Sequence, residues 1–393
     1  MVDQPLVINP TSATRHESGV RQLRIALAHD WLCGVRGGEH VLERIAALVA
    51  REHECAGLYV MFDNGGPIGP AVDACRKVVA GIGRWPWSDQ LRRWLLPLYP
   101  RAVGELSGEL AREHARRPID LVISTSSAAI KGLRAPEGVP HLCYCHSPAR
   151  YIWGQDARYR GGLRGAGLSA VKRWYREWDR RTSENVTRFL ANSRHTQQEI
   201  RRCFWRESEV VHPPVRQMFS DAPLRGASDG PWLVVSALEP YKRVELAIDA
   251  AMQAGHELVV VGDGSQRRVL ETRSGGRVKF LGRVSDERLR EVYAQASLLL
   301  FPQVEDFGIV AVEAQASGLP VVARRAGGAI DIIVDGATGA LFDEDSVESL
   351  LAGVERCPRA CADACRENAG RFSEQRFDAE MRAQIASVRP AIR

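Results

Sequence analysis

The sequence predicts an α/β protein with two doubly wound, Rossmann-like domains that face each other across a cleft. Short apolar segments, each followed by a polar loop and a stretch of helical periodicity, alternate from residue 22 to the end of the chain. This order is typical of a parallel sheet with helices on both faces. The alternation lapses over residues 216–230, where Gly, Ser, Pro and Asp are frequent. We interpret that stretch as a linker between two domains of similar size.

The composition is that of a globular protein that is long enough for two cores. Of the 393 residues, 45% are hydrophobic and 26% are charged, and the net charge is +5. This surplus is too small to indicate nucleic-acid binding, and no apolar run approaches the roughly 18 residues that cross a bilayer. The first residues contain no continuous apolar segment of the secretory type. We therefore expect a cytoplasmic protein, with residues 1–21 as a flexible tail.

Nine cysteines in a chain of this kind indicate reduced thiols and not a disulfide framework. Two groups have spacings that a metal site could use, but both lie in apolar strand-like or helical segments, where thiols fill a core. These groups are Cys143, Cys145 and His146, and Cys357, Cys361 and Cys365. We predict no metal site and no cofactor.

The first domain is expected over residues 22–215. Its first strand is followed by a glycine-containing loop and the helix EHVLERIAALVA. Ser193, or Thr196 with Glu199, is placed to cap a later helix, HTQQEIRRCF. The expected strands are RQLRIALAHD (21–30), DLVISTSS (120–127), HLCYCHSP (141–148) and RFLANS (188–193).

The second domain is expected over residues 231–375. It contains the predicted helix VELAIDAAMQAG, and residues 376–393 are expected to form a C-terminal helix, with a crossing back to the first domain left open. The strand-like segments are PWLVVSAL, HELVVVGDG, RVKFLGRVS, ASLLLFP and LPVVARRAGG. The Gly-x-Gly of VVVGDGSQRRVL resembles half of a dinucleotide fingerprint, but Arg267 occupies the third glycine position. An ordinary strand-to-helix turn explains it at least as well, so we predict no NAD site.

Two loops at the ends of predicted strands could hold an anion. In GVRGGEH, Gly37 and Gly38 would let backbone amides at a helix N-terminus approach a ligand. An ordinary glycine-containing connection explains that loop equally well. In SALEPYKRVELAI, Lys242 and Arg243 precede a helix and would suit a diphosphate, although two adjacent basic residues on a loop are more often simply solvated.

The segment EDFGIVAVEAQASGLPVVA carries two glutamates, Glu305 and Glu313, in a strip otherwise suited to burial. If a helix begins near Gly308, the N–H groups of Phe307, Gly308 and Ile309 lack helical partners and attract an anion. Glu313 would then lie about 7.5 Å along the helix axis. A sugar nucleotide fits this layout, with its phosphates at the amides, its sugar at Glu305 and its ribose at Glu313. Ionised carboxylates accept hydrogen bonds from such hydroxyls.

A basic and aromatic surface is also predicted in the first domain. The segment RWPWSDQLRRWLLPLYPR (84–101) contains three tryptophans and four arginines, and a second basic group surrounds the helix from Leu168. Such a surface could rest on anionic lipid. The alternative is a solvated helix face beside a packed aromatic segment. The basic residues of the second group are Arg158, Arg160, Arg164, Lys172, Arg173, Arg176, Arg180 and Arg181.

Taken together, the motifs resemble the retaining GT-B glycosyltransferases of family 4, which carry an E-x7-E signature. The resemblance covers most of residues 22–345, in the family's order. The combination of YCHSPARYIW with SALEPYKR is most similar to a bacterial subgroup that builds surface polysaccharides, often with GDP-mannose as donor. The matching segments are HDW…GGEH, DLVISTSS, YCHSPARYIW, FLANSRH, VVHPPV, SALEPYKRVELAI, VVVGDG, KFLGRVSDERL and FPQVEDFGIVAVEAQASGLPVVA.

The resemblance implies a GT-B fold, with an acceptor-binding first domain and a second domain that binds the nucleotide sugar. It implies catalytic roles for three residues: His146 facing the sugar, Lys242 at the diphosphate and Glu305 at the sugar hydroxyls. The implied donor contacts are Gly37 and Gly38 at the diphosphate, the amides of Phe307, Gly308 and Ile309, Glu313 at the ribose, and Phe280, Leu281 and Gly282 at the base.

One position departs from the family pattern. Many members have an arginine shortly before the motif lysine, where this chain has Ala237 and Leu238. We therefore expect Arg243 or Arg283 to assist Lys242 at the diphosphate, and the sequence does not choose between them.

The implied activity is a metal-independent transfer of a hexose, mannose from GDP-mannose, to a glycan acceptor. A polyprenyl-diphosphate-linked acceptor at the inner face of the cell membrane would suit the basic aromatic surface. Two alternatives stay open: a non-catalytic sugar-nucleotide-binding partner protein, and a GT-B epimerase that acts on UDP-GlcNAc and releases free sugar.

Overall fold

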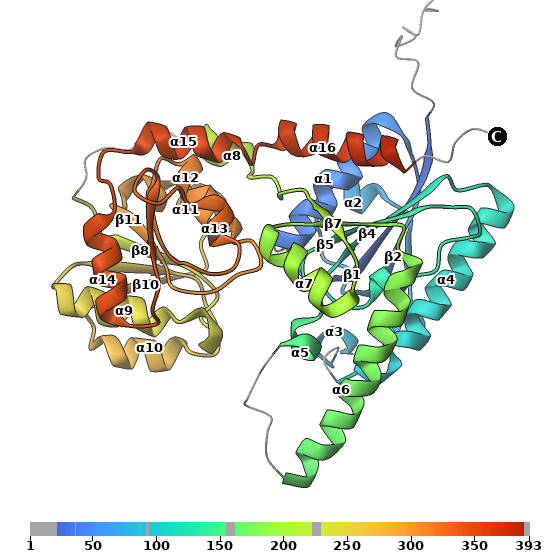
Figure 1. Ribbon diagram of the computed structural model, residues 1–393, viewed down its shortest axis with the longest axis horizontal. Helices are drawn as coiled ribbons and strands as arrows, with labels where there is room; N and C mark the ends of the chain where they lie inside the picture. The colour runs from blue at the N-terminus through green and yellow to red at the C-terminus, as the bar shows by residue number, and fades with distance from the viewer. Residues whose placement is uncertain are drawn as a thin grey trace, which may run out of the picture.

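A computed structural model of the chain describes residues 22–35, 37–85, 87–91, 94–154, 162–221 and 229–388. Within these ranges the chain forms two parallel sheets, each covered by helices on both faces, in two lobes that lie side by side (Figure 1). The predicted α/β fold with two Rossmann-like domains is confirmed. All strand pairs recorded in both sheets are parallel.

The first sheet has seven strands in the order β3-β2-β1-β4-β5-β6-β7 among the described residues. The order reverses between β1 and β4, which is the doubly wound arrangement. β1 continues two residues into the segment expected to be a loop, because Trp31 and Leu32 pair with β2, a strand that the sequence reading did not identify. The strands are β1 (Arg24–Leu32), β2 (Glu54–Asp63), β3 (Lys77–Val79), β4 (Leu121–Ser126), β5 (His141–Cys145), β6 (Arg188–Ala191) and β7 (Ser208–Val210).

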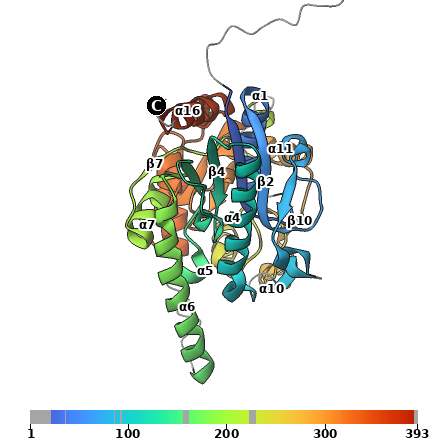
Figure 2. The same ribbon diagram turned by 90° about the vertical axis from the view of Figure 1, so that its right-hand side faces the viewer.

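Alternate residues of these strands point to opposite faces of the sheet, and each face has its own apolar core. Ile25 and Leu27 face α1 and α2, whereas Ala26 and Ala28 face α4, α6 and α7. Helix α6 extends well beyond the body of the domain (Figure 2). The helices of this domain are α1 (Gly37–Glu52), α2 (Pro70–Ala74), α3 (Ser88–Leu91), α4 (Tyr99–Arg116), α5 (Arg150–Trp153), α6 (Gly162–Thr182) and α7 (Arg194–Phe204).

The second sheet has six strands in the order β10-β9-β8-β11-β12-β13 among the described residues. Its order reverses between β8 and β11, so the loops that follow these two neighbouring strands lie at the same edge. The strands are β8 (Trp232–Val235), β9 (Leu258–Val261), β10 (Val278–Gly282), β11 (Leu298–Phe301), β12 (Val321–Arg324) and β13 (Gly339–Phe342).

Two apolar cores also cover the faces of the second sheet. One contains α8, α11, α12, α13 and α15, and the other contains α9, α10 and α14. The helices are α8 (Gln217–Ser220), α9 (Val244–Ala254), α10 (Arg267–Ser274), α11 (Asp286–Gln295), α12 (Ile309–Ala316), α13 (Ala329–Ile332), α14 (Val347–Arg356) and α15 (Ala362–Gly370). No helix in the described part of the chain is both long and apolar enough to span a membrane.

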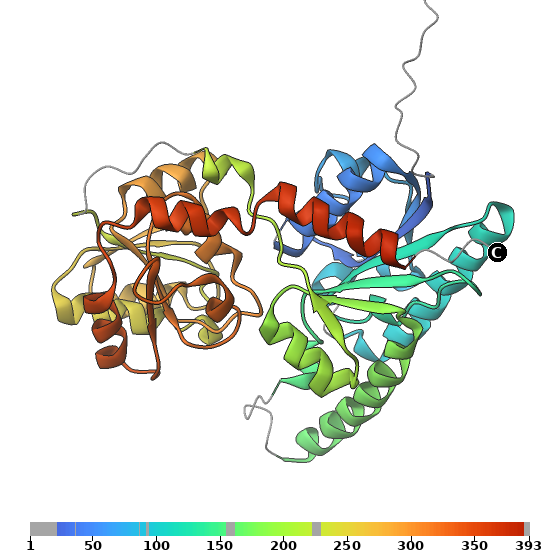
Figure 3. The same ribbon diagram turned by 45° about the horizontal axis from the view of Figure 1, so that its top comes forward.

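The last helix, α16 (Glu374–Ser387), leaves the second domain and lies on the first (Figures 1 and 3). Its buried side chains Phe377, Met381 and Ile385 join the core that contains α1. This helix belongs to the first domain by packing, although it follows the second domain in the chain.

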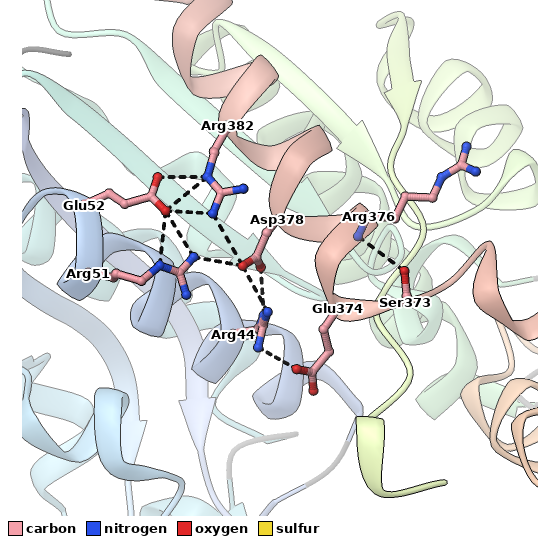
Figure 4. A network of polar contacts seen from close by, with 8 residues as sticks. All are labelled: Arg44, Arg51, Glu52, Ser373, Glu374, Arg376, Asp378 and Arg382. Atoms are coloured by element: carbon pink, nitrogen blue, oxygen red, sulfur yellow. Dashed lines mark hydrogen bonds and ion pairs between the residues drawn. The ribbon is translucent and has the colours of Figure 1, made fainter. Parts of the chain in front are cut away.

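A polar network at the surface reinforces the contact between α16 and α1 (Figure 4). Asp378 is 4% exposed and accepts hydrogen bonds from Arg44 at 2.7 and 3.0 Å and from Arg51 at 2.9 Å. Arg382 donates to Glu52 at 2.7–3.0 Å. Exposed ion pairs contribute little to stability, so the buried Asp378 is the important member of this network.

Candidate functional site

Lys242 and Glu305 meet at the edge of the second sheet. Lys242 ends the short 3-10 helix Pro240–Lys242 after β8, and Glu305 lies in the loop after the neighbouring strand β11. The Nζ atom of Lys242 contacts Oε1 of Glu305, and each side chain is 15% exposed. The structure thus brings together two of the three residues that were expected to be catalytic.

Helix α12 begins at Ile309, with Gly308 as its N-cap, so the predicted helix start near Gly308 is confirmed. Gly308 has φ of +100°, and a Cβ atom there would lie 2.9 Å from the Phe301 ring. Only glycine fits this position without displacement. Within the described chain, the N–H groups of Phe307, Gly308 and Ile309 donate no hydrogen bond. A Cβ atom at Gly308 would lie 3.8 Å from Cβ of Glu305, the residue that Lys242 contacts. Such amides at a helix N-terminus attract anions.

Two adjacent glycines, Gly327 and Gly328, pack against the loop that carries Glu305. Gly328 N donates a hydrogen bond to the carbonyl oxygen of Glu305 at 2.9 Å. A Cβ atom at Gly328 would lie 2.3 Å from Cα of Phe307, and one at Gly327 would lie 2.2 Å from the Glu305 carbonyl oxygen. Our sequence reading missed this role. The adjacent glycines that follow β12 in LPVVARRAGG are the signal that could have revealed it.

The N-terminus of α1, in the first domain, faces the N-terminus of α12. A Cβ atom at Gly37 would lie 3.7 Å from Cγ2 of Ile309, and one at Gly38 would lie 3.5 Å from Nε2 of His146. The two predicted glycines, His146 and the start of α12 therefore meet where the domains touch.

His146 is held by its backbone and presents a neutral ring. Its N–H donates to Ser126 O at 2.8 Å, and its carbonyl oxygen accepts from Asn192 Nδ2 at 2.9 Å. The ring Nε2 is buried and has no hydrogen-bond partner among the described residues. Burial, together with the nearby His29, lowers the pKa of His146 to about 3. At neutral pH this ring can exchange hydrogen bonds with a hydroxyl, but it supplies no positive charge.

Glu313, the second glutamate of the motif, is 6% exposed and is engaged by protein groups. Tyr293 donates to Oε2 of Glu313 at 3.4 Å, and Arg216 donates to Oε1, also at 3.4 Å. Arg216 also pairs with Asp286 at 3.0 Å. Burial raises the pKa of Glu313 to about 7, against the opposing effect of Arg216. Arg216 was not among the predicted site residues, although it directly follows the VVHPPV motif.

The two arginines that were expected to assist Lys242 lie elsewhere. Arg243 pairs with Glu245 at 3.2 Å and with Asp345 at 2.8 Å. Arg283 is exposed and forms no ion pair within the described residues. Neither contacts Glu305.

The segment expected to bind the base lies on the edge strand β10. Phe280 packs against one core of the domain, and Leu281 packs against the other. Gly282 has φ of +68°, and its carbonyl oxygen accepts from Gly262 N at 2.7 Å. No recorded contact within the described chain joins these residues to Lys242 or Glu305.

An arginine of the first domain, Arg150, reaches the Glu305 loop. It begins α5 in the YCHSPARYIW motif, and its guanidinium lies 2.7 Å from Asp306 Oδ2 and 3.4 Å from Glu305 Oε2. Nearby, the Ser193 hydroxyl accepts from Thr196 N, as predicted for the N-cap of α7, and donates to the Asp306 carbonyl oxygen. Our sequence reading missed Arg150 as a site residue.

The described residues contain no group of three or more His, Cys, Asp and Glu side chains arranged to hold a metal ion. The predicted cysteine series does not share one helix, because α14 ends at Arg356 and α15 begins at Ala362. Cys357, Cys361 and Cys365 are nevertheless all buried.

Two family models match the chain, one for each domain. The model described as Glycosyltransferase Family 4 matches residues 37–216. The model described as Glycosyl transferases group 1 matches residues 228–363. Between them they cover every strand of both sheets except β1, and they include Gly37, Arg150, Lys242 and Glu305.

Curated relatives match over shorter stretches. The D-inositol 3-phosphate glycosyltransferase of Mycolicibacterium smegmatis is 34% identical over 155 residues, which are 35% of this chain and 36% of that protein. The GDP-mannose-dependent alpha-mannosyltransferase of Corynebacterium glutamicum is 37% identical over 123 residues, which are 31% of this chain and 30% of that protein. The chain thus aligns with about a third of the length of each of these relatives.

Solved structures match over nearly the whole chain. The sucrose-phosphate synthase of Thermosynechococcus elongatus superposes with a TM-score of 0.71, covering 94% of this chain and 99% of that one. The two sequences are 19% identical, so this likeness concerns the fold alone.

Proposed function

Because its two domains match the models of Glycosyltransferase Family 4 and Glycosyl transferases group 1, we propose that the chain transfers a hexose from a nucleotide sugar to a glycan acceptor with retention. The observation that carries the proposal is the contact between Lys242 and Glu305, in the loop that leads into the open amides of α12. A cation and a helix N-terminus are suited to a diphosphate, and the adjacent carboxylate is suited to sugar hydroxyls.

The main barrier to glycosyl transfer is the charge that develops on the departing diphosphate. Lys242 and the amides of Phe307, Gly308 and Ile309 would stabilise that charge at the place where it forms. The bond between the anomeric carbon and the phosphate oxygen breaks while the acceptor oxygen bonds to the same face of the carbon. The leaving phosphate oxygen takes the proton of the acceptor hydroxyl. This route uses no carboxylate nucleophile and no metal ion.

Glu305 and His146 would position the transferred sugar. Once a phosphate takes Lys242, the Glu305 carboxylate is released to accept hydrogen bonds from sugar hydroxyls. The neutral His146 ring, with its unpartnered Nε2 beside Gly38, suits a hydroxyl on the other side of the sugar. Glu313 would bind the ribose, in which case it exchanges a contact with Arg216 or Tyr293 for the ribose hydroxyls.

We propose that the donor is GDP-mannose and that mannose is the sugar transferred. One of the relatives is named as a GDP-mannose-dependent mannosyltransferase, and it is 37% identical to this chain over 123 residues. Bacterial surface polysaccharide synthesis is the corresponding process, because the motif combination in this chain is most similar to that subgroup.

The acceptor we propose is linked to a lipid, at a membrane that carries anionic headgroups. The tryptophans of the segment before α4 are exposed: Trp87 by 72% and Trp94 by 83%. The Tyr99 and Tyr175 rings, 6.4 Å apart, join this segment to α6, on which Trp174 is also exposed. Exposed tryptophans beside basic side chains are typical of surfaces that rest on lipid headgroups.

The basic part of this surface is only partly described. Arg173 and Arg181 of α6 are exposed, whereas Arg176 donates to the Ile152 carbonyl oxygen. Arg158 and Arg160 lie outside the described residues, as does the side chain of Arg164. The proposal of a lipid surface therefore depends mainly on the tryptophans.

A screen of GDP-, UDP- and ADP-sugars by thermal shift, followed by product analysis, tests this function. Binding to the folded state raises the apparent melting temperature, so the proposed donor, GDP-mannose, should give the largest shift. Transfer or slow donor hydrolysis should follow in the same samples. Binding without turnover would favour the non-catalytic partner protein. Release of free sugar from UDP-GlcNAc without an acceptor would favour the epimerase.

A further inference from the structure

The loop after β11 carries two adjacent carboxylates that receive cations from both domains. Lys242, from the second domain, contacts Oε1 of Glu305. Arg150, from the first domain, lies 3.4 Å from Oε2 of the same carboxylate and 2.7 Å from Asp306 Oδ2. The two oxygens of the Glu305 carboxylate therefore each face a cation, and the two cations come from different domains.

The backbone that carries Arg150 is firmly held, while the Arg150 side chain is 46% exposed. In the same short helix, Trp153 Nε1 donates to the buried Asp179 at 2.7 Å, and the Ile152 carbonyl oxygen accepts two hydrogen bonds, at 2.6 and 2.9 Å, from Arg176. Arg150 can therefore change partner by rotating its side chain, without moving α5.

The other arginines considered for the diphosphate are less well placed. Arg243 is engaged by Asp345 and Glu245, and Arg283 does not reach the Glu305 loop. We propose that Arg150 is the second cation of the donor site and binds the diphosphate together with Lys242. This inference rests on the proposed function, because it assumes a nucleotide-sugar donor at Lys242.

The balance of charge supports this exchange of partners. Lys242 and Arg150 together neutralise Glu305 and Asp306. A donor with a negative charge on each of its two phosphates would compete for both cations, and a guanidinium binds phosphate oxygens in a bidentate manner. The exchange frees Glu305 for the sugar. Because Arg150 comes from the first domain, the donor would then connect the two domains.

The test is the affinity of the purified full-length chain for a nucleoside diphosphate and for the matching monophosphate, measured by calorimetry. Replacing Arg150 by Ala should weaken diphosphate binding by at least about tenfold, since hydrogen bonds between charged groups contribute this much. The affinity for the nucleoside monophosphate should fall by a smaller factor. Arg150→Gln keeps most of the side-chain length without the charge, and should show the same loss if the alanine variant folds poorly.

Two matched controls separate diphosphate binding from a purely structural contact between domains. Asp306→Asn removes the main partner of Arg150 and should leave diphosphate affinity at or above the wild-type value. Arg194→Ala removes another arginine that reaches across the interface, to Asp331 at 3.8 Å, and should leave it unchanged. A loss in Asp306→Asn as large as that in Arg150→Ala would overturn the inference, and so would wild-type affinity in both Arg150 variants.

Failure of the proposed function would look different. In that case the wild-type chain itself would bind no nucleoside diphosphate or nucleotide sugar, and the inference would fall with it. Normal wild-type binding that does not respond to Arg150 would reject this inference alone.

Discussion

Lys242 and Glu305, which are 63 residues apart in the chain, form an ion pair at the ends of two neighbouring parallel strands. Each residue is the main partner of the other, so a ligand that takes one releases the other. This relationship leads to opposite expectations for donor binding when either residue is changed.

Replacing Lys242 by Ala should abolish transfer and weaken nucleotide-sugar binding. The variant loses the cation that would stabilise the leaving diphosphate, while Glu305 keeps Arg150 as a partner and the fold should survive. Turnover is measured as nucleoside diphosphate release, and folding by melting temperature. Lys279→Ala, at an exposed position on β10, is the matched control and should retain full activity. Wild-type turnover in purified Lys242→Ala would reject the role given to this lysine.

Replacing Glu305 by Gln should lower kcat while leaving nucleoside diphosphate affinity unchanged or higher. The variant loses a charged acceptor for the sugar hydroxyls, which corresponds to a decrease of about tenfold or more. It also removes the carboxylate that competes with phosphate for Lys242. Steady-state kinetics and calorimetry with the free nucleotide separate the two effects. A parallel loss of both quantities would indicate that Glu305 acts by holding the loop in place.

The pH dependence of stability should report on Glu313. Its pKa of about 7 in the folded protein lies above the value of 4.5 for an unperturbed glutamate. The folded state therefore binds the proton more tightly, and the stabilisation from protonated Glu313 is lost as pH rises from about 4.5 through 7. Glu313→Gln removes this loss. The melting temperature of the variant minus that of the wild type should increase between pH 5 and pH 8, and a constant difference would contradict the raised pKa.

Liposome flotation should detect the proposed lipid surface. Wild-type protein is expected to float with vesicles that contain anionic lipid more than with neutral vesicles. The double change Trp87→Ala and Trp94→Ala should weaken that binding by at least about tenfold, because both rings are available for burial in the headgroup region. Trp205→Ala is the control, since this exposed ring belongs to the C-cap residue after α7 and stacks with Arg180. Equal and negligible flotation with both vesicle types would reject the surface.

The attachment of α16 to the first domain should depend on Asp378. Replacing this buried carboxylate by Ala removes the acceptor of Arg44 and Arg51, with an expected cost of about 3 kcal/mol in the free energy of unfolding. Glu380→Ala, two residues further along α16, removes only a solvent-accessible pair with Arg376 and should cost less than about 0.5 kcal/mol. Urea unfolding measures both. Similar costs for the two variants would mean that the network in Figure 4 contributes little.

Much of the fold could be predicted because its signals are local. Apolar strands followed by polar loops, and a glycine at the start of α12, reflect burial and backbone conformation within a few residues. The resemblance implied that Lys242 and Glu305 share one site, and the structure brings them together because β8 and β11 are neighbouring parallel strands with their carboxyl ends at one edge. The strand β2 was not predicted. Because Trp31 and Leu32 extend β1 by pairing with β2, the end of β1 was also predicted too early.

The contacts that were missed depend on how distant parts of the chain are placed relative to each other. Arg150 meets Glu305 across the domain interface, 155 residues away in the chain. Arg216 meets Glu313 only because α8 packs against the second domain. Nothing in the local sequence around either arginine indicates its partner. Arg243 shows the converse, because its position next to Lys242 in the chain suggested a shared ligand, while its side chain points to Asp345.

Among the described residues the chain crosses between the domains twice, before α8 and before α16, and the two crossings are joined by a hydrogen bond of 2.7 Å from Val215 N to Phe372 O. Two adjacent covalent connections would favour a hinge rotation of the lobes about one axis over sliding or twisting of one lobe against the other. Opening would then separate Arg150 from Glu305, and closing would restore the same contact between them. A substrate that enters between them would meet the same alignment of groups in every cycle.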